Sequence, residues 1–280
     1  MKLRLGFFIS VFFCACSVEQ SNEKLSIFKY NESAGISSLD PAFSKDQANI
    51  WATDQLFNGL VQLDTDLKVQ PAIAKSWNIS EDALIYIFHL REEILFHSHE
   101  LFQTEQERVV VASDFTYSFN RLTDPKVASP GAWVMSNVAS YEALNDSTFQ
   151  IRLKTPFPPF LGLLSMSYCS VVPEEIVEQT AFRDVPVGTG PFQFQYWKEN
   201  VKLVLRKNPD YFEKGLPKLD AVAVTFVKDK QTAFLEFIKG NLDFISGLDA
   251  SYKDEVLTRD GKLQADYQDK IVLQSQPYLN

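Results

Sequence analysis

The sequence predicts an α/β protein built from two packing units. Short apolar strands and amphipathic helices alternate along the chain, a pattern typical of mixed α/β folds. The chain has 280 residues, of which 45% are hydrophobic, so it can bury one sizeable core and has room for a second. The run Val187-Gly188-Thr189-Gly190-Pro191 is the sharpest break in the pattern, and we expect it to join the two units.

The first elements surround a helix predicted near residue 50. Residues 24–30 alternate weakly and predict an opening strand. Residues 38–41 predict a turn, because a proline biases the residue before it away from helical conformation. Ser44 and Gln47 fit a capping box, in which each side chain satisfies a free backbone N–H at the helix start. We expect this helix to end at Asn58-Gly59, where glycine can adopt a left-handed conformation.

The next stretch predicts short elements separated by polar loops. Residues 71–77 predict a helix with proline in its first turn. Residues 84–90 are apolar at both alternating sets of positions and predict a strand buried on both faces. Residues 109–111 predict another strand, and Ser113 is expected to cap a helix over residues 113–122 with its aromatic residues on one face.

Strand and helix patterns continue on both sides of the glycine–proline break. Before it, residues 148–153 predict a strand, and residues 174–179 predict a helix opened by Pro173. After it, we expect a hairpin of residues 192–197 and 201–206, a buried strand at 221–227, a helix at 231–239 ended by Gly240, and a strand at 243–245.

The N-terminus carries the features of an exported protein. Two basic residues precede an apolar run over residues 5–15, which is too short to span a hydrocarbon core of about 30 Å as a helix. The run ends in Ala15-Cys16, which resembles the lipobox of bacterial lipoproteins. We therefore expect a signal peptide at residues 1–15, lipidation of Cys16, and a lipid-anchored linker at residues 16–23. An ordinary signal peptide cut near Ala15 and a retained membrane anchor are the alternatives.

Charge and cysteine content narrow the function classes. The formal net charge is −9, and no cluster of Lys and Arg offsets it, so the surface would repel phosphate backbones and nucleic-acid binding is disfavoured. Once Cys14 leaves with the signal peptide and Cys16 carries lipid, only Cys169 remains, so no intrachain disulfide is expected. We interpret Cys169 as a small buried apolar residue.

The sequence contains no recognisable catalytic motif, and we predict no enzyme activity and no cofactor. A nucleophile elbow, a phosphate loop and a zinc-protease helix are all missing, and residues 188–190 lack the third glycine of a dinucleotide fingerprint. His97 and His99 could face a metal from one strand, but we interpret them as polar loop residues because no further ligands follow at recognisable spacing. Four tryptophans could line a ligand cleft, although core packing is their default role: Trp51, Trp77, Trp133 and Trp197.

Five segments together resemble family 5 of the bacterial solute-binding proteins, the dipeptide-, oligopeptide- and nickel-binding type. They follow one another in the order found in that family, and the run 56–91 and the joint Gly188-Thr189-Gly190-Pro191-Phe192 are individually specific. The matching segments are residues 38–98, 110–130, 145–161, 185–194 and 206–212.

The resemblance implies an α/β fold of the type II periplasmic-binding-protein-like class. Family members are nearly twice this length, so we expect the first lobe and the small extra domain, with the second lobe missing. The incomplete first lobe is expected at residues 24–58 and 186–280, and the extra α/β domain at residues 59–185. A strand edge left unpaired near residues 221–227 or at the C-terminus is then expected.

The resemblance also implies where a ligand would bind. Residues 39–41 would shape the edge of the ligand cleft. The segment that follows lies where oligopeptide binders present their backbone to an extended peptide, unless the capping box commits these groups to the helix. Some relatives carry a ligand-touching aromatic where this chain has Gly131. The candidate contacts are therefore Ser44, Lys45, Asp46, Gln47 and Trp133.

The function implied is that of an extracytoplasmic peptide-binding subunit of an ABC importer. It would be anchored by lipid at the periplasmic or extracellular face of a membrane and would deliver solute to an ABC permease. A nickel or other small-solute binder on the same scaffold, an exported hydrolase and a non-binding lipoprotein fragment are the alternatives. Because hinge-closing binders trap ligand between two lobes, we expect weak or no binding by this chain alone.

Overall fold

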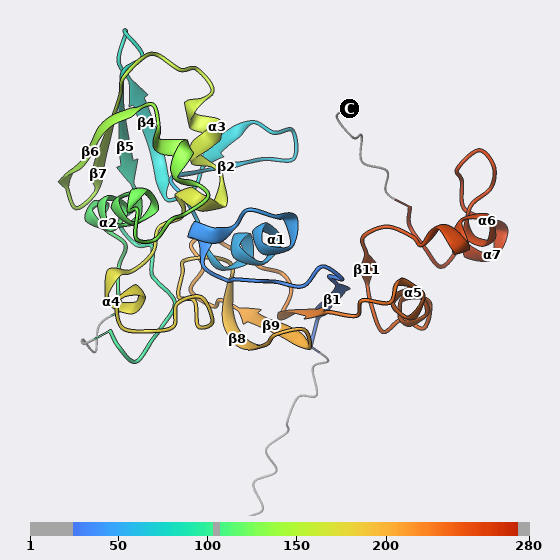
Figure 1. Ribbon diagram of the computed structural model, residues 1–280. Coiled ribbons are helices and arrows are strands. Elements are labelled where there is room, and N and C mark those ends of the chain that lie inside the picture. Colours follow the sequence, from blue (N-terminus) through green and yellow to red (C-terminus); the bar gives the residue numbers. More distant parts are fainter. Residues whose placement is uncertain (1–24, 103–106, 274–280) are drawn as a thin grey trace, which may run out of the picture.

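The computed structural model describes residues 25–102 and 107–273, and a five-stranded sheet draws strands from both ends of this stretch (Figure 1). Its strands are β1 (Ile27–Asn31), β8 (Phe192–Lys198), β9 (Lys202–Lys207), β10 (Ala221–Thr225) and β11 (Phe244–Ile245). The strand order is β11-β1-β10-β9-β8. β1 runs parallel to both of its neighbours, whereas β8, β9 and β10 pair antiparallel.

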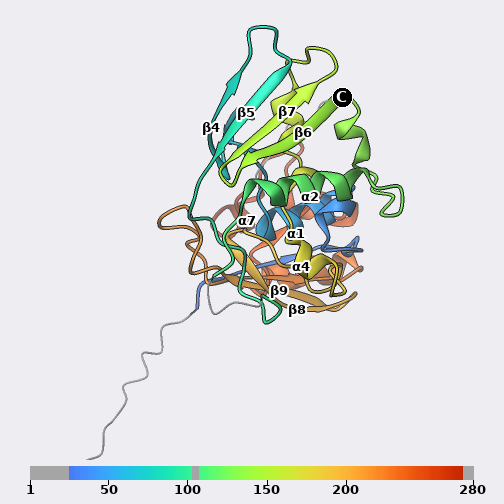
Figure 2. The ribbon, with the colours of Figure 1, turned by 90° about the vertical axis from the view of Figure 1, so that its left-hand side faces the viewer.

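A second, four-stranded sheet forms the other end of the molecule (Figure 2). Its strands are β4 (Ala74–Ile79), β5 (Ile85–Leu90), β6 (Val138–Asn145) and β7 (Thr148–Leu153). They pair antiparallel in the order β4-β5-β7-β6. A separate hairpin is formed by β2 (Val61–Leu63) and β3 (Val69–Pro71).

Helix α2 (Ala112–Thr123) covers one face of the four-stranded sheet, as Figure 2 shows. Its buried face carries Phe115, Phe119 and Leu122. The rings of Phe115 and Phe119 lie 5.7 and 5.6 Å from the ring of Phe149 on β7, so the helix and the sheet share an aromatic core. This core is continuous with the apolar side chains of the five-stranded sheet, such as Leu203 and Val222.

The remaining helices are short, apart from α1, which lies between the two sheets (Figure 1). The α-helices are α1 (Gln47–Leu56), α3 (Phe160–Leu164), α4 (Glu174–Val177), α5 (Lys230–Ile238), α6 (Lys253–Val256) and α7 (Ala265–Gln268). The 3-10 helices are η1 (Pro41–Phe43), η2 (Ala132–Met135), η3 (Ser167–Cys169) and η4 (Ala250–Tyr252).

The glycine–proline break packs directly onto the end of α1. A Cβ atom on Gly190 would lie 2.4 Å from the carbonyl carbon of Leu56, and one on Gly188 would lie 2.1 Å from its oxygen. The Gly190 N–H also donates to the Leu56 carbonyl at 2.8 Å. Glycine is therefore needed here for close approach of two backbones, which supports the packing interpretation of this segment.

The helix predicted at residues 71–77 is wrong, because β3 and β4 occupy this stretch. Trp77 of β4 pairs with Phe88 of β5. Pro71 ends β3, where a residue without an N–H costs the sheet little. The partner strand β5 follows after a short turn, but the proline at the start of the stretch favoured a helix opening over a strand end.

The predicted capping box at the start of α1 is also wrong. Asp46 is the N-cap, and its carboxylate accepts from the Asn49 N–H at 3.0 Å. Ser44 is buried and its hydroxyl hydrogen-bonds with that of Thr53 at 2.8 Å. The helix ends at Leu56, before Gly59, because the chain turns there to meet the glycine–proline break.

Four further expectations are corrected. β5 alternates between buried and half-buried residues, so only one of its faces is buried. Residues 109–111 form a single bridge from Val109 to Leu95 instead of a strand. Helix α2 is capped by Val111, with Ser113 inside it. The open edge was expected near residues 221–227 or at the C-terminus; β10 is paired on both sides, and among the described strands β8 and β11, the last of them along the chain, form the edges of this sheet.

Candidate functional site

The parallel strands β1, β10 and β11 end side by side, and a hollow of about 340 Å³ lies beyond these ends. Ligands of open α/β sheets bind outside the carboxyl ends of parallel strands, because the loops that leave the sheet there diverge. We call this the strand-end hollow. It is lined by Glu32, Ala34, Gly35, Ile36, Ser37, Asp46, Gln47, Ala48, Glu199, Asn200 and Ser246.

Two buried asparagines fix the loop that forms one wall of the strand-end hollow. Asn31, the last residue of β1, donates to the Val227 carbonyl at 2.9 Å and accepts from the Val227 N–H at 2.8 Å. Asn49 on α1 accepts from the Ser37 N–H at 3.0 Å and donates to the Ser37 hydroxyl at 2.9 Å. The loop over residues 32–37 is therefore held at both ends, with its middle facing the hollow.

The strand-end hollow is electronegative. Glu32 is buried, and one of its carboxylate oxygens accepts from the Ala34 N–H at 3.1 Å. Asp46 caps α1, and Glu199 lies in the turn between β8 and β9. Burial, followed by the negative charge of Glu32, raises the pKa of the Tyr30 hydroxyl, so this tyrosine stays neutral at physiological pH. The site therefore suits hydrogen-bond donors and cations.

The predicted site residues divide between three places. Asp46 and Gln47 line the strand-end hollow. Lys45 lines a neighbouring hollow of about 440 Å³, together with Ser37 and Arg183. Ser44 is buried against Thr53, and Trp133, which is 53% exposed on η2, lines neither hollow.

Residues 39–41 were expected to shape the cleft edge, but Leu39 and Asp40 are buried. The Asp40 carboxylate forms a two-point ion pair with the guanidinium of Arg121 on α2, with one Nη1–Oδ1 distance of 3.0 Å. It also accepts from the Ala42 N–H at 3.0 Å. This segment therefore ties the loop after β1 to the helix that covers the other sheet.

The two histidines considered as metal ligands have other partners. The Gly188 N–H donates to Nδ1 of His97 at 3.3 Å, and Nε2 lies 3.0 Å from the Gly190 carbonyl, which requires the proton on Nε2. Burial lowers the pKa of His97 to about 4, so the ring is neutral. His99 Nδ1 accepts from the Leu101 N–H at 3.2 Å. Within residues 25–102 and 107–273, no three His, Cys, Asp or Glu side chains are grouped to hold a metal ion.

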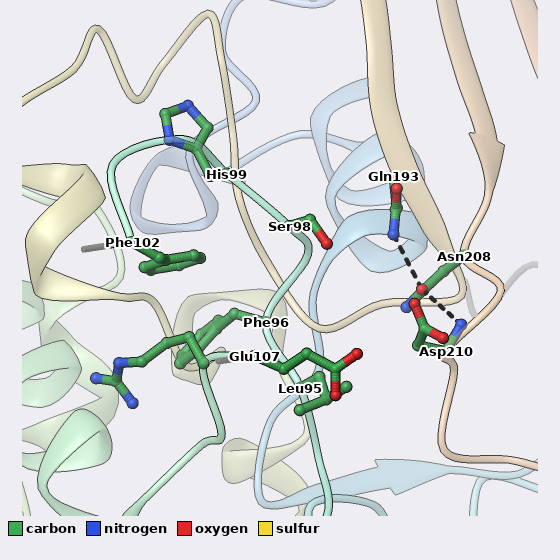
Figure 3. Close-up of a pocket in the computed structure, with 10 residues that line it drawn as sticks. Leu95, Phe96, Ser98, His99, Phe102, Glu107, Gln193, Asn208 and Asp210 are labelled. Atoms are coloured by element: carbon green, nitrogen blue, oxygen red, sulfur yellow. Dashed lines mark hydrogen bonds between the residues drawn. The ribbon is translucent and has the colours of Figure 1, made fainter. Parts of the chain in front are cut away.

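A smaller hollow of about 180 Å³ lies between the loop after β5 and the strand β8 (Figure 3). Several of its polar groups already bond with one another. Asn208 accepts from Gln193 at 3.0 Å and from the Asp210 N–H at 3.1 Å, and its own amide donates to the Gly190 carbonyl at 2.9 Å. These contacts hold the glycine–proline break in place, so we interpret this hollow as structural.

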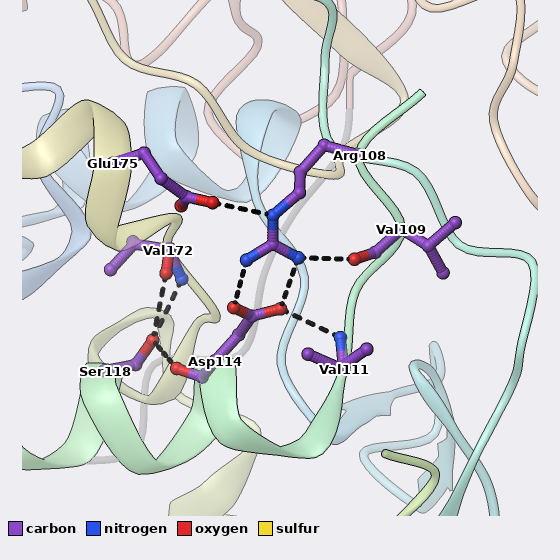
Figure 4. A network of polar contacts seen from close by, with 7 residues as sticks. All are labelled: Arg108, Val109, Val111, Asp114, Ser118, Val172 and Glu175. Carbon is purple, nitrogen blue, oxygen red and sulfur yellow. Dashed lines mark hydrogen bonds and ion pairs between the residues drawn. The ribbon is translucent and has the colours of Figure 1, made fainter. Parts of the chain in front are cut away.

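An ion-pair network joins α2 to α4 (Figure 4). Arg108 lies between the two helices; its Nη2 is 2.6 Å from Asp114 Oδ1, and its Nε is 2.9 Å from Glu175 Oε1. Asp114 also accepts from the Val111 N–H at 2.8 Å, which caps α2. All three charges are used within the protein, so this network anchors helices.

Cys169 is likewise structural: it is buried, which raises the pKa of its thiol to about 12.

The sequence predictions missed most of the hollow. Glu32, Glu199 and Ser246 come from three segments far apart in the chain, and none of them belongs to a motif. One local signal was present: the glycine Gly35, in a left-handed turn with φ of +76°, follows β1 within four residues. A glycine turn directly after a buried strand indicates a loop that leaves the sheet sharply.

Comparisons with known proteins match this chain to one group. The family model described as bacterial extracellular solute-binding proteins, family 5 Middle, matches residues 68–278. The chain is 27% identical over 242 residues to the dipeptide-binding protein DppE of Bacillus subtilis, covering 80% of this chain and 43% of that protein.

Solved structures agree with the family match. The periplasmic binding protein DppA from Helicobacter pylori, in complex with the peptide STSA, superimposes with a TM-score of 0.75 and 30% identity over 82% of this chain and 48% of that one. NikZ from Campylobacter jejuni, in complex with Ni(L-His), gives 0.70 and 26%, over 81% and 44% of the two chains. The chain thus spans less than half the length of these relatives. In the part of the chain that the structure describes, no helix has the length and apolar character needed to cross a membrane.

Proposed function

Because the chain belongs to the bacterial extracellular solute-binding proteins of family 5, we propose that it forms part of a peptide-binding component of an ABC importer. This is a family of binding proteins, so the proposed role involves capture and delivery without covalent chemistry. The relatives named for dipeptide binding and for a bound peptide support a peptide ligand.

The strand-end hollow is the observation that carries this proposal. It lies at the carboxyl ends of parallel strands, and the loop over residues 32–37, held by Asn31 and Asn49, borders it. An extended peptide binds well to such a segment, because main-chain groups recognise its backbone regardless of side chain. Among the predicted contacts, we propose Asp46 and Gln47 for this site. Ser44 is engaged with Thr53, while Lys45 and Trp133 would touch only a ligand that extends beyond the hollow.

The remaining parts of the prediction are proposals as well. A signal peptide at residues 1–15, lipid on Cys16 and a linker at residues 16–23 lie outside the described residues. With them the protein would be held at the periplasmic or extracellular face of a membrane, beside an ABC permease. The lobe boundaries at residues 58/59 and 185/186 also stay predictions.

The test measures thermal unfolding of the full chain with trialanine, free alanine or nickel–histidine. A ligand that binds only the folded state raises Tm by an amount that grows with its concentration over Kd. Because weak binding still stabilises the fold once the ligand concentration exceeds Kd, we expect trialanine at high concentration to raise Tm and free alanine to leave it unchanged. Gln47→Trp places a large ring in the strand-end hollow and should abolish the shift, whereas Gln179→Trp, at another exposed glutamine, should preserve it.

A nickel or other small-solute binder is the second candidate, supported by the likeness to NikZ. This second function is favoured if nickel–histidine raises Tm and trialanine does not. If neither ligand shifts Tm of the chain, the peptide proposal fails for this chain, and a non-binding lipoprotein fragment becomes the better interpretation.

A further inference from the structure

We propose that the strand-end hollow binds a cationic group of its ligand, an ammonium or a guanidinium, through the carboxylate of Glu32. This inference rests on the proposed function, since it assigns a ligand chemistry to the same hollow. It goes further by naming one side chain, Glu32, that would distinguish ligands by their charge. Backbone contacts alone would bind these ligands equally well.

The position of Glu32 is fixed by its own backbone. Its N–H donates to the Thr225 carbonyl at 2.9 Å, which extends the pairing of β1 with β10 by one residue. Its carbonyl accepts from the Gly35 N–H at 3.2 Å, which closes the turn. The residue is 8% exposed, and it lines the hollow. The carboxylate is thus held in place beside the hollow before a ligand arrives. Binding would cost little free energy for ordering this side chain.

The carboxylate of Glu32 has one unused oxygen. Oε1 accepts from the Ala34 N–H at 3.1 Å. Oε2 accepts no hydrogen bond from any described residue, yet it is not among the fully enclosed unpaired atoms, so it meets the open space of the hollow. Within the described residues, no Lys, Arg or His nitrogen lies within 4.0 Å of this carboxylate. A carboxylate this buried is costly to leave without a cation, and a charged donor from the ligand would offset that cost.

The surroundings add to this preference. Asp46 and Glu199 also line the hollow, whereas its lining contains no Lys, Arg or His among the described residues. Arg183, whose Nη2 is 4.0 Å from Glu199 Oε1, lines the neighbouring hollow instead. Carboxylates gathered around a concave surface raise the local concentration of cations, and an ion-paired hydrogen bond is about twice as strong as a neutral one.

The experiment is a titration of the full, 15N-labelled chain, followed through the backbone amides of residues 32–37. Four peptides separate the sources of positive charge: trialanine, N-acetyl-trialanine, N-acetyl-Ala-Lys-Ala and N-acetyl-Ala-Glu-Ala. We expect a cation-bearing peptide to bind roughly tenfold tighter than N-acetyl-trialanine, and the glutamate peptide to bind weaker still. Trialanine as the tighter binder would identify the terminal amine as the group recognised, and the acetylated lysine peptide would identify a side chain.

Glu32→Gln keeps the shape of the side chain and should reduce this tenfold ratio to about one. Glu81→Gln removes the same charge from an exposed turn in the other sheet and should leave the ratio intact. Thermal unfolding shows whether Glu32→Gln folds. If it does not fold, the ratio of the peptide Kd values measured on the natural chain tests the inference. Equal binding of all four peptides would overturn the cation inference and leave the proposed function standing. Absence of any binding would overturn both.

Discussion

The two sheets of this molecule are assembled in opposite ways. The four-stranded sheet takes all its strands from residues 74–153, pairs them antiparallel and covers them with α2. The five-stranded sheet takes β1 from the start of the described chain and its other strands from residues 192–245, and it places β1 between two parallel neighbours.

This difference separates a sheet that packs the core from a sheet that borders the candidate site. The locally built sheet encloses tightly packed phenylalanines, with Phe88, Phe115, Phe119 and Phe149 all under 2% exposed. The sheet built from distant segments has parallel strand ends, and loops from separate parts of the chain converge there on the strand-end hollow. The comparison teaches that the candidate site arises where the chain must return to itself, beside a core that closes locally.

The largest expected effect compares how much apolar packing on each of the two sheets contributes to the free energy of unfolding. Phe149→Ala removes a ring that contacts both Phe115 and Phe119, and should lower the free energy of unfolding by about 3 to 5 kcal/mol. Val224→Ala on β10, also buried, should lower it by about 2 kcal/mol. Urea unfolding measures both. Equal losses would contradict the prediction that the aromatic packing on the four-stranded sheet contributes more to stability.

The second prediction concerns the link between the two regions. Asp40→Asn keeps the size of the side chain but leaves Arg121 without its counter-charge, and should cost about 3 kcal/mol of unfolding free energy. Adding Arg121→Gln removes the unpaired cation, so the double variant should regain part of the loss. A double variant that is merely additive would argue against coupling through this pair.

The third prediction is a pH dependence of stability that comes from His97, beside the glycine–proline break. Because burial lowers the pKa of His97 to about 4, the unfolded chain binds a proton near pH 6.5 that the folded chain binds only near pH 4. The free energy of unfolding should therefore fall as the pH decreases from 6.5 to 4, by up to about 3 kcal/mol. His97→Gln should flatten this part of the curve. Parallel curves for the two proteins, measured by urea unfolding at each pH, would exclude His97 as the cause.

The smallest effect concerns the glycine–proline break. Gly190→Ala places a Cβ atom 2.5 Å from the Gln55 carbonyl oxygen and should cost about 2 kcal/mol, because two backbones must separate. Gly162→Ala is the matched control: its Cβ would meet no atom within 4 Å, and alanine favours the helix α3 by about 1 kcal/mol. Similar Tm shifts for both variants would contradict close packing at the break.

The family and the fold class were predictable from the sequence and are confirmed by the comparisons. Elements with strong local signals were also right. The strand at residues 148–153, the hairpin of β8 and β9, and the helix α5 followed by Gly240 at φ +76° all form. Their alternation or end signals lie within the element itself, so no distant partner is needed to read them.

What failed either had a weak local signal or depended on distant partners. β6 was not predicted, since only Val138 on it is buried and its pattern has no regular alternation. A small part of the strand-end hollow was predicted: Asp46 and Gln47 lie in it, but Glu32 and Glu199 reach it from segments whose proximity follows from sheet order. Sheet order depends on long-range pairing, which a local pattern does not encode.

The parallel pairing of β1 with β10 has a consequence for how the chain folds. Ile27 and its partner Ala221 are separated by nearly the whole described chain, so β1 must wait for the other strands before its backbone groups find partners. During synthesis the antiparallel sheet can form first, whereas β1 stays exposed until β10 has left the ribosome. Completion of the strand-end hollow therefore needs segments from both ends of the described chain, and β1 cannot pair with β10 until residue 221 has been synthesised.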